Sequence, residues 1–390
     1  MLKRIFSLFV LLCGLAALQN HAAAQTRDGW VVDLEPMWMS VKGFDQHTGD
    51  VVRTTTVLTI SPLRLTENVT RQPIMNRMDA GMKFRGAIQY RRQGWGGGVS
   101  GWSFSSENAI NGNASSLGSS GSLIFGTTGV SMWRENVDPV ENDIEPSGLS
   151  PIEFHSNARL RTYAFDVFAF RTVTATTNTN RLDLIVGAKT GRMKTTQSQG
   201  FGQRAFVFDF FQTGTHLNNV ITLGTDAEAN FVGTGPLIGI RGQTRWRRFG
   251  ISAGITEALM MGKARQEGVM TDTDDISIAR SPTGPFLPCP ANLASQGCLP
   301  IHSEIHFSTS PTVFIPVSEL RLRLQFDLTD RVSLSGQGFT AIWGNAPVPP
   351  AFTSTHAFAS GSSSPGLDWA LQQQTLRFAG AGIALSVNLD

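Results

Sequence analysis

The regular alternation of apolar and polar residues is the dominant pattern in this chain. Between residues 77 and 91, the mostly apolar parity comprises Met78, Ala80, Met82, Phe84, Gly86, Ile88 and Tyr90. The opposite parity comprises Arg77, Asp79, Gly81, Lys83, Arg85, Ala87, Gln89 and Arg91. Successive side chains of a strand point to opposite faces, so this segment predicts a strand with one apolar and one charged face. Residues 319–328 repeat the pattern.

Weaker forms of the same alternation predict ten strands in all. They cover residues 29–42, 77–92, 95–106, 155–173, 181–196, 228–246, 249–264, 315–328, 332–344 and 370–389. Tight turns connect some of them, at residues 93–94, 175–180, 247–248 and 329–331. Between these pairs we expect long loops, at residues 43–76, 107–154, 197–227, 265–314 and 345–369.

Short turns that alternate with long loops in an even-stranded meander are typical of outer-membrane barrels. Structureless loops above about 12–15 residues are uncommon in compact soluble domains. We therefore predict an all-β fold, an antiparallel up-and-down transmembrane β-barrel of about ten strands with short periplasmic turns and long external loops. The alternative is a soluble periplasmic barrel or sandwich, in which the apolar parity faces inward.

The first residues resemble an export signal. Lys3 and Arg4 precede an apolar run over residues 5–18, and Ala22-Ala23-Ala24 has the small-residue pattern of a cleavage site. We expect residues 1–24 to be a secretory signal peptide and residues 25–390 to form a single barrel domain. Without Lys3 and Arg4, 30 basic residues would stand against 30 acidic ones, so the formal charge of +2 would disappear.

The composition narrows the class of protein. Only 16 % of the 390 residues are charged, against about 25 % in an ordinary soluble domain. A chain with 41 % hydrophobic residues and this little charge is neither disordered nor a typical nucleic-acid binder. A mean hydropathy of −0.05 is too polar for a bundle of membrane helices.

Two cysteines remain after the predicted signal. Cys289 and Cys298 lie nine residues apart in a proline-rich segment, and an exported chain meets an oxidising compartment. We predict a local disulfide between them. The alternative is a metal site that adds His302 and His306, although their spacing matches no known ligand pattern.

Aromatic residues gather near the predicted strand ends. Tyr90, Trp95, Trp246 and Phe249 flank the tight turns, whereas Trp38, Trp102 and Trp343 lie near the opposite ends. Two interfacial belts of a membrane barrel would place aromatics at both levels. The alternative is that these rings form the core of a sandwich.

The charged parity would face the lumen of such a barrel. The lumen-lining candidates are Arg77, Asp79, Lys83, Arg85, Arg241, Arg245, Glu319, Arg321, Arg323 and Asp327. Further charged residues assigned to this parity are Asp33, Glu35, Arg91, Arg159, Arg161, Asp183 and Lys189. Basic residues outnumber acidic ones, which would favour small anions in a water-filled path. Eight strands leave an interior that side chains just fill. A packed ion-pair network in a plugged barrel is therefore the other interpretation.

The sequence favours no enzyme. The histidines are scattered, and no Walker-type phosphate-binding loop occurs. We expect no catalytic residue, metal or cofactor, and a hydrolase at the external rim is the least favoured reading. The expected partners are outer-membrane lipid, with small anionic solutes or a surface partner as further candidates, and no nucleic acid. A plugged barrel that acts as an adhesin through its long loops is the alternative to a narrow pore.

Several segments resemble one family of barrels. They are Trp30–Gly43, Asp166–Phe170 with Arg181–Lys189, Phe231–Trp246 with Phe249–Ala264, and Leu320–Asn345 followed by Leu367-Asp368-Trp369-Ala370. Together they resemble the planctomycete-type outer-membrane β-barrel family, related to the Legionella-type major outer-membrane (pore-forming) proteins. The resemblance touches most strands and few loops, and it implies fold and location rather than activity.

The chain departs from that family in places. Asn345–Pro350 replaces an Arg-Pro-Gly-rich turn, and the chain ends Leu389-Asp390 without the terminal aromatic typical of outer-membrane barrels. Glu257 also has the parity of the lipid face. We expect either a bulge near Gly254 that returns Glu257 to the lumen, or a position close to an interface.

Overall fold

The computed structural model describes residues 29–43, 46–60, 63–76, 80–114, 121–125, 130–133, 148–149, 152–177, 180–207, 216–279, 287–288, 301–349, 352–357, 362–367 and 372–389. The predicted signal peptide, residues 1–24, lies outside these ranges, as do Cys289 and Cys298. Within these ranges, no helix is long and apolar enough to span a membrane.

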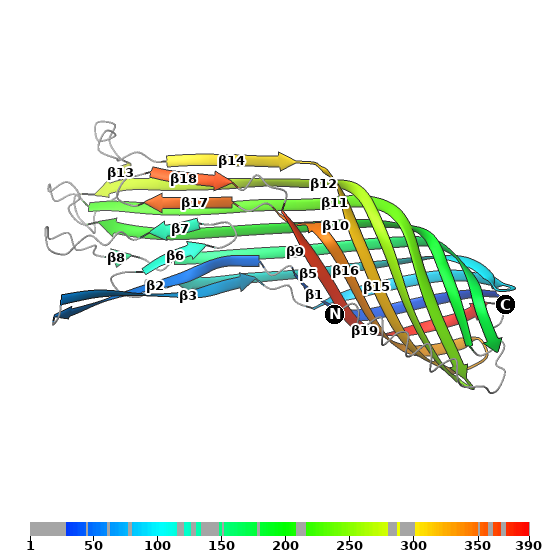
Figure 1. Ribbon diagram of the computed structural model, residues 1–390. Helices are drawn as coiled ribbons and strands as arrows, with labels where there is room; N and C mark the ends of the chain where they lie inside the picture. The colour runs from blue at the N-terminus through cyan, green and yellow to red at the C-terminus, as the bar shows by residue number, and fades with distance from the viewer. Residues whose placement is uncertain are drawn as a thin grey trace.

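Ten strands close into an antiparallel barrel (Figure 1). They are β1 (Gly29–Lys42), β4 (Gly81–Arg92), β5 (Trp95–Ala114), β9 (Ile152–Thr177), β10 (Asn180–Val207), β11 (His216–Trp246), β12 (Phe249–Ala279), β15 (Thr312–Asp327), β16 (Val332–Pro347) and β19 (Gln373–Leu389). Each pairs with the next, and β1 pairs with β19 from Trp30–Leu389 to Lys42–Arg377, which closes the ring. The predicted fold class, an up-and-down barrel of ten strands, is confirmed.

The two ends of the barrel differ. Turns at residues 93–94, 247–248 and 328–331 lie at one end together with Gly29 and Leu389, and we call this the short-turn end. The opposite, long-hairpin end is uneven, because β9, β10, β11 and β12 have 26, 28, 31 and 31 residues. Figure 1 shows these four strands running far beyond β15, β16 and β19.

Much of what was predicted as loop at the long-hairpin end is therefore strand. Residues 197–207 and 216–227 continue the β10–β11 ladder, and residues 265–279 continue β12. The prediction of long loops over 197–227 and 265–314 is wrong for these parts. These segments are rich in Ser, Thr, Gly and Asn, a composition typical of loops. In the structure, continuous backbone pairing makes them arms of long hairpins.

A second sheet is drawn at the same end of the molecule as this extension in Figure 1. It comprises β18 (Ser362–Leu367), β17 (Phe352–Ala357), β7 (Val130–Trp133), β6 (Gly121–Phe125), β2 (Gln46–Ile60) and β3 (Leu63–Asn76), in that order. The short strand β8 (Gly148–Leu149) pairs with β10, and β13 (Leu287–Pro288) and β14 (Ile301–Thr309) pair with β12. The predicted loops thus contribute β structure at this end.

The apolar parity faces outward. Phe84 on β4 is 60 % exposed and Leu324 on β15 is 64 % exposed, whereas Lys83 beside Phe84 is buried and Arg323 beside Leu324 is half-buried. The alternative of a soluble barrel with its apolar parity inward is therefore wrong. A continuous apolar surface of this kind is the outer face of barrels that span membranes.

Two of the predicted belt tryptophans lie inside the barrel. Trp38, Trp95 and Trp246 are exposed on the outer face, but Trp102 and Trp343 are buried in the interior. The belt prediction is wrong for this pair because residue type alone cannot tell an interfacial ring from a lumen-filling one. Parity settles the question, since Trp102 and Trp343 share their faces with Ser100 and Ala341.

Glu257 lies on the outer face without a bulge. The pairing of β12 with β11 and with β15 runs through Gly254 in unbroken register, so the bulge that would turn Glu257 inward does not form. The carboxylate accepts a hydrogen bond of 2.5 Å from the Ser318 hydroxyl on β15. This neighbouring donor partly offsets the cost of an outward-facing charge.

A cysteine pair across the β1–β19 seam tests closure. Ser40 and Ala379 are directly opposed, which places their Cβ atoms about 4.5–5.5 Å apart, close to disulfide geometry. We expect Ser40→Cys with Ala379→Cys to cross-link in the folded barrel, as read by peptide mapping. Ser40→Cys with Ile383→Cys is the matched control, about 13 Å apart by strand rise. Equal yields from both pairs would contradict the register.

Candidate functional site

The barrel interior holds the predicted site. Arg77 and Asp79 lie outside the described residues. The other eight candidates are buried or half-buried on inward positions of three strands: Lys83 and Arg85 of β4, Arg241 and Arg245 of β11, and Glu319, Arg321, Arg323 and Asp327 of β15. All of them except Lys83 belong to, or lie beside, three polar clusters that also include residues of other strands.

The central cluster is built on Lys189 of β10. Its Nζ lies 2.6 Å from Asp166 Oδ1 of β9 and 2.8 Å from Glu319 Oε1 of β15. Glu319 also accepts hydrogen bonds from Trp102 Nε1 at 3.1 Å and from Arg321 Nη2 at 2.9 Å. Both Lys189 and Glu319 are almost fully buried, so each charge depends on the other for compensation.

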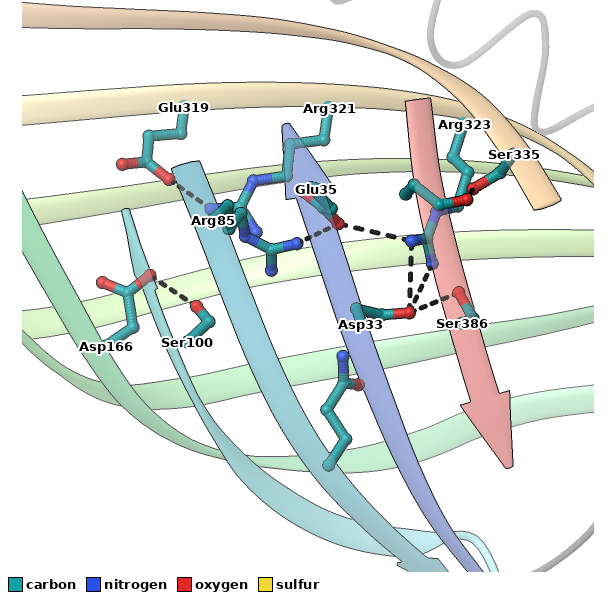
Figure 2. Close-up of polar contacts among 12 residues, drawn as sticks. Asp33, Glu35, Arg85, Ser100, Asp166, Glu319, Arg321, Arg323, Ser335 and Ser386 are labelled. Carbon is teal, nitrogen blue, oxygen red and sulfur yellow. Dashed lines mark hydrogen bonds and ion pairs between the residues drawn. The ribbon is translucent and has the colours of Figure 1, made fainter. Parts of the chain in front are cut away.

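A second cluster joins β1 to β4, β15 and β19 (Figure 2). Arg85 Nη1 donates to Glu35 Oε1 at 2.5 Å, and Arg323 Nη2 lies 3.3 Å from the same oxygen. Arg323 donates to Asp33 Oδ1 from both Nη atoms at 3.2 Å, and the Ser386 hydroxyl donates to it at 2.5 Å. These contacts connect the first and last strands of the barrel through its interior.

The third cluster surrounds Asp183 near the short-turn end. Its Oδ2 accepts from Arg91 Nη2 at 2.8 Å and from Arg241 Nη2 at 3.1 Å, and Arg181 Nε lies at 3.5 Å. The Thr172 hydroxyl donates to Oδ1 at 2.8 Å. Three arginines around one buried carboxylate leave a local excess of positive charge. Arg245 pairs with Asp327 beside this cluster.

Two assignments on β9 need correction. Arg159 and Arg161, predicted to face the lumen, lie on the outward parity, where Arg159 pairs with Glu107 of β5 at 3.6 Å. The sequence analysis also missed Asp166, which shares the inward face with Phe168 and Phe170. Both parities of this strand carry charge, so alternation alone could not separate the faces.

Lys83 has no carboxylate partner among the residues that the structure describes. Its Nζ is fully buried, lies 2.9 Å from the ring centroid of Phe339 and 4.8 Å from that of Trp102, and makes no hydrogen bond to the described residues. Aromatic faces attract an ammonium group and take the place of the missing ion pair. Lys83 therefore marks the boundary between the polar clusters and the apolar interior.

An apolar layer fills the lumen on the long-hairpin side of these clusters. Inward positions continue from Glu319 to Val317 and Ile315 on β15, and from Trp102 to Phe104 on β5, and all are buried. The other members that are almost fully buried are Met37, Met39, Leu160, Met193, Phe231, Met260, Trp343, Leu376 and Phe378. We call this set the apolar layer.

The apolar layer is closely packed. The ring centroids of Trp102, Trp343 and Phe378 lie 5.9–6.4 Å apart in edge-on arrangements. On β10, a Cβ added to the inward-facing Gly191 would lie 2.9 Å from Trp343 Cη2 and from the Met260 side chain. The absence of a side chain at Gly191 therefore leaves room for the Trp343 ring.

A basic cavity opens at the short-turn end. It has a volume of about 720 Å³. Its charged lining residues are Asp33, Arg91, Arg181, Arg241, Arg245, Arg247, Arg248, Arg323, Asp327, Asp330 and Arg331. A smaller cavity of about 110 Å³ shares Asp33, Arg241 and Arg323 and extends to Glu319 and Arg321. We call the larger cavity the basic vestibule, and it leads toward the apolar layer.

Ion pairs dominate the chemistry of this interior. Each described carboxylate in the three clusters has a cationic partner, and the part of the chain that the structure describes contains no group of three or more His, Cys, Asp or Glu placed to hold a metal ion. The arrangement can fix side chains, exclude water from the apolar layer and attract anions to the basic vestibule.

Comparisons with known proteins give distant likenesses of fold. No known protein family and no curated sequence matches the chain. Among solved structures, it is similar to the outer-membrane protease OmpT from Escherichia coli (12 % identity, 95 % of this chain and 100 % of that one, TM-score 0.40). It is also similar to the P. putida toluene transporter TodX (8 %, 93 % and 91 %, 0.24) and to the transport unit of the E. coli autotransporter AIDA-I (8 %, 98 % and 97 %, 0.25). The fold assignment rests on the strand pairing of this chain.

Neutralising Glu319 tests the central cluster. Glu319→Gln leaves Arg321 without its carboxylate partner and leaves the buried Lys189 with Asp166 alone, so we expect a loss of about 3 kcal/mol in the free energy of unfolding. Glu267→Gln is the matched control, because Glu267 also pairs with an arginine two residues away but is exposed, and it should cost less than about 1 kcal/mol. Urea unfolding in detergent measures both. Equal losses would contradict the structural role of the buried cluster.

Proposed function

We propose that this chain is an outer-membrane β-barrel closed to free diffusion by its own side chains, and that it displays β structure at the cell surface for contact with a partner. The apolar layer across the lumen carries this proposal. The long β9–β12 extension and the second sheet provide the surface for such contacts. An export signal over residues 1–24 and the absence of catalytic activity belong to the same proposal.

The outer face supports insertion into a bilayer. On β9, the outward residues between Arg171 and Arg161 are Ala169, Val167, Phe165 and Tyr163, without a charge. The ten residue steps from Arg171 to Arg161 span about 25 Å along the barrel axis at ~3.3 Å per residue and a tilt of about 40°, which is the height of the apolar band in such barrels.

Aromatic residues indicate where the apolar band ends on the short-turn side. The Trp30 and Tyr90 rings lie 4.9 Å apart, and the Phe249 and Phe326 rings 5.0 Å apart. Arg171 lies over the exposed Trp95 ring, with its Cζ 4.9 Å from the centroid. Aromatic rings with a cation beside them suit the level of lipid headgroups.

A narrow pore with anion preference is the second candidate, and the basic vestibule favours it. Eight arginines and three aspartates line this cavity, so anions would concentrate at its mouth. A path through the barrel would require the apolar layer to move aside. The planctomycete-type family resemblance, whose relatives include pore-forming proteins, is compatible with either candidate.

Bilayer conductance separates the two functions. We expect no conductance above background for the wild-type chain in a planar bilayer. Trp343→Ala with Phe378→Ala removes two rings from the apolar layer and should give discrete, anion-preferring channels. Trp38→Ala is the matched control, because the Trp38 ring is 64 % exposed on the outer face, and it should stay silent.

Each variant is first checked for folding by its different migration on gels before and after heating, and for recovery with the outer-membrane fraction. Wild-type channels as large as those of the double variant would contradict closure. A folded double variant that stays silent would contradict the role of these two rings, and channels that prefer cations would contradict the role of the vestibule.

A further inference from the structure

Basic side chains gather on the outer face of β9, β10 and β12. In one register row, Arg192 of β10 lies between Tyr163 of β9 and Val232 of β11, and Val232 is opposite Lys263 of β12. The next row toward the long-hairpin end contains Arg161, Lys194 and Arg265, with Asn230 of β11 between the latter two. Neighbouring strands lie about 4.8 Å apart, so five cations lie within a few strand spacings.

Three of these cations have no ionic partner in the described part of the chain. Lys194 Nζ pairs with Glu228 at 2.7 Å, and Arg265 pairs with Glu267 at 2.6 Å. Those acids lie farther toward the long-hairpin end, where outward charges of both signs alternate. Arg161, Arg192 and Lys263 form no ion pair with any described residue, so they present uncompensated positive charge.

An apolar groove begins beside these cations. Its volume is about 410 Å³, and its outward-facing walls include Phe84, Tyr163, Phe165 and Val232. Gly101, on the outward parity of β5, lies in it and carries no side chain that could fill it. Arg192 is the charged residue of its lining, so the groove is apolar along its walls and cationic where it meets Arg192.

The level of the cations matches a headgroup region. Arg161 lies about 25 Å from Arg171 along the barrel axis by strand rise and tilt, and the outward positions between them are uncharged. A cation at the end of an apolar span extends toward the polar surface of a bilayer. The surface therefore matches the two parts of a lipid: the apolar groove lies at the level of the acyl chains, and the cations lie at the level of the headgroup.

We propose that this surface binds an anionic lipid, with an acyl chain in the groove and a headgroup phosphate against Arg161, Arg192 and Lys263. This inference rests on the proposed membrane location. Charge complementarity selects the ligand, because a zwitterionic headgroup would bring its own cation against these side chains. A partner protein would instead need carboxylates at the depth of lipid headgroups.

Native mass spectrometry of the detergent-solubilised full chain tests the site. Phosphatidylglycerol and phosphatidylcholine are added in turn, and bound lipids are counted. We expect a preference for phosphatidylglycerol, and the triple variant Arg161→Gln, Arg192→Gln and Lys263→Gln should weaken its binding at least about tenfold, since each cation near a bilayer contributes to attraction of anionic lipid. Phosphatidylcholine binding should not change.

The matched control removes the same charge elsewhere. Lys42 and Arg377 are opposed across the β1–β19 seam, and Arg171 lies at the other end of β9, all exposed on the outer face away from the groove. Changing these three to Gln should weaken phosphatidylglycerol binding less than about twofold. An equal loss in both triple variants would overturn the site in favour of general electrostatic attraction.

The groove has its own test. Gly101→Leu would fill it without changing a charge and should also weaken phosphatidylglycerol binding. A wild-type chain that shifts on heating and fractionates with the outer membrane, yet binds both lipids equally, would overturn this inference and leave the proposed function standing. A wild-type chain recovered in soluble form without detergent would overturn the proposed function itself.

Discussion

Closure of the ring between β1 and β19 is the constraint on which the rest of this molecule depends. A bilayer offers no water to hydrogen-bond an open strand edge, so every ladder must be paired around the circle. Ten paired strands then enclose an interior only somewhat wider than the eight-stranded case, which side chains fill. Arg323, which reaches Asp33 across the lumen, and Ser386, which donates to the same carboxylate, show how interior polar contacts support this seam.

The barrel interior changes character along its axis, from paired charges to an apolar layer. Near the short-turn end, buried charges are compensated by partners on other strands, as Lys189 is by Asp166 and Glu319. Toward the long-hairpin end, aromatic and methionine side chains fill the lumen and exclude water. The order matters for function, because a basic vestibule that leads to an apolar layer attracts anions without giving them a continuous polar path.

Alternation was sufficient to predict all ten barrel strands, because β structure with one apolar face repeats every second residue whatever its surroundings. It also assigned the inward face of β4 and β15 correctly. It failed on β9, where Arg161 faces outward and Asp166 inward, since charge on both parities removes the contrast. The contacts could not be predicted, because Trp102 and Glu319 are 217 residues apart and meet only through the closed ring. Polar strand segments such as residues 197–207 of β10 were predicted as loops, because their composition is typical of loops.

A single cysteine approached from the two faces of a membrane tests the closed interior most directly. Gln325 lines the basic vestibule, and Gln325→Cys, with Cys13, Cys289 and Cys298 changed to Ser, places one thiol there. A small impermeant thiol reagent should modify this cysteine when added at the short-turn face and should leave it unmodified when added at the long-hairpin face. Modification at comparable rates from both faces would contradict a barrel closed by its apolar layer.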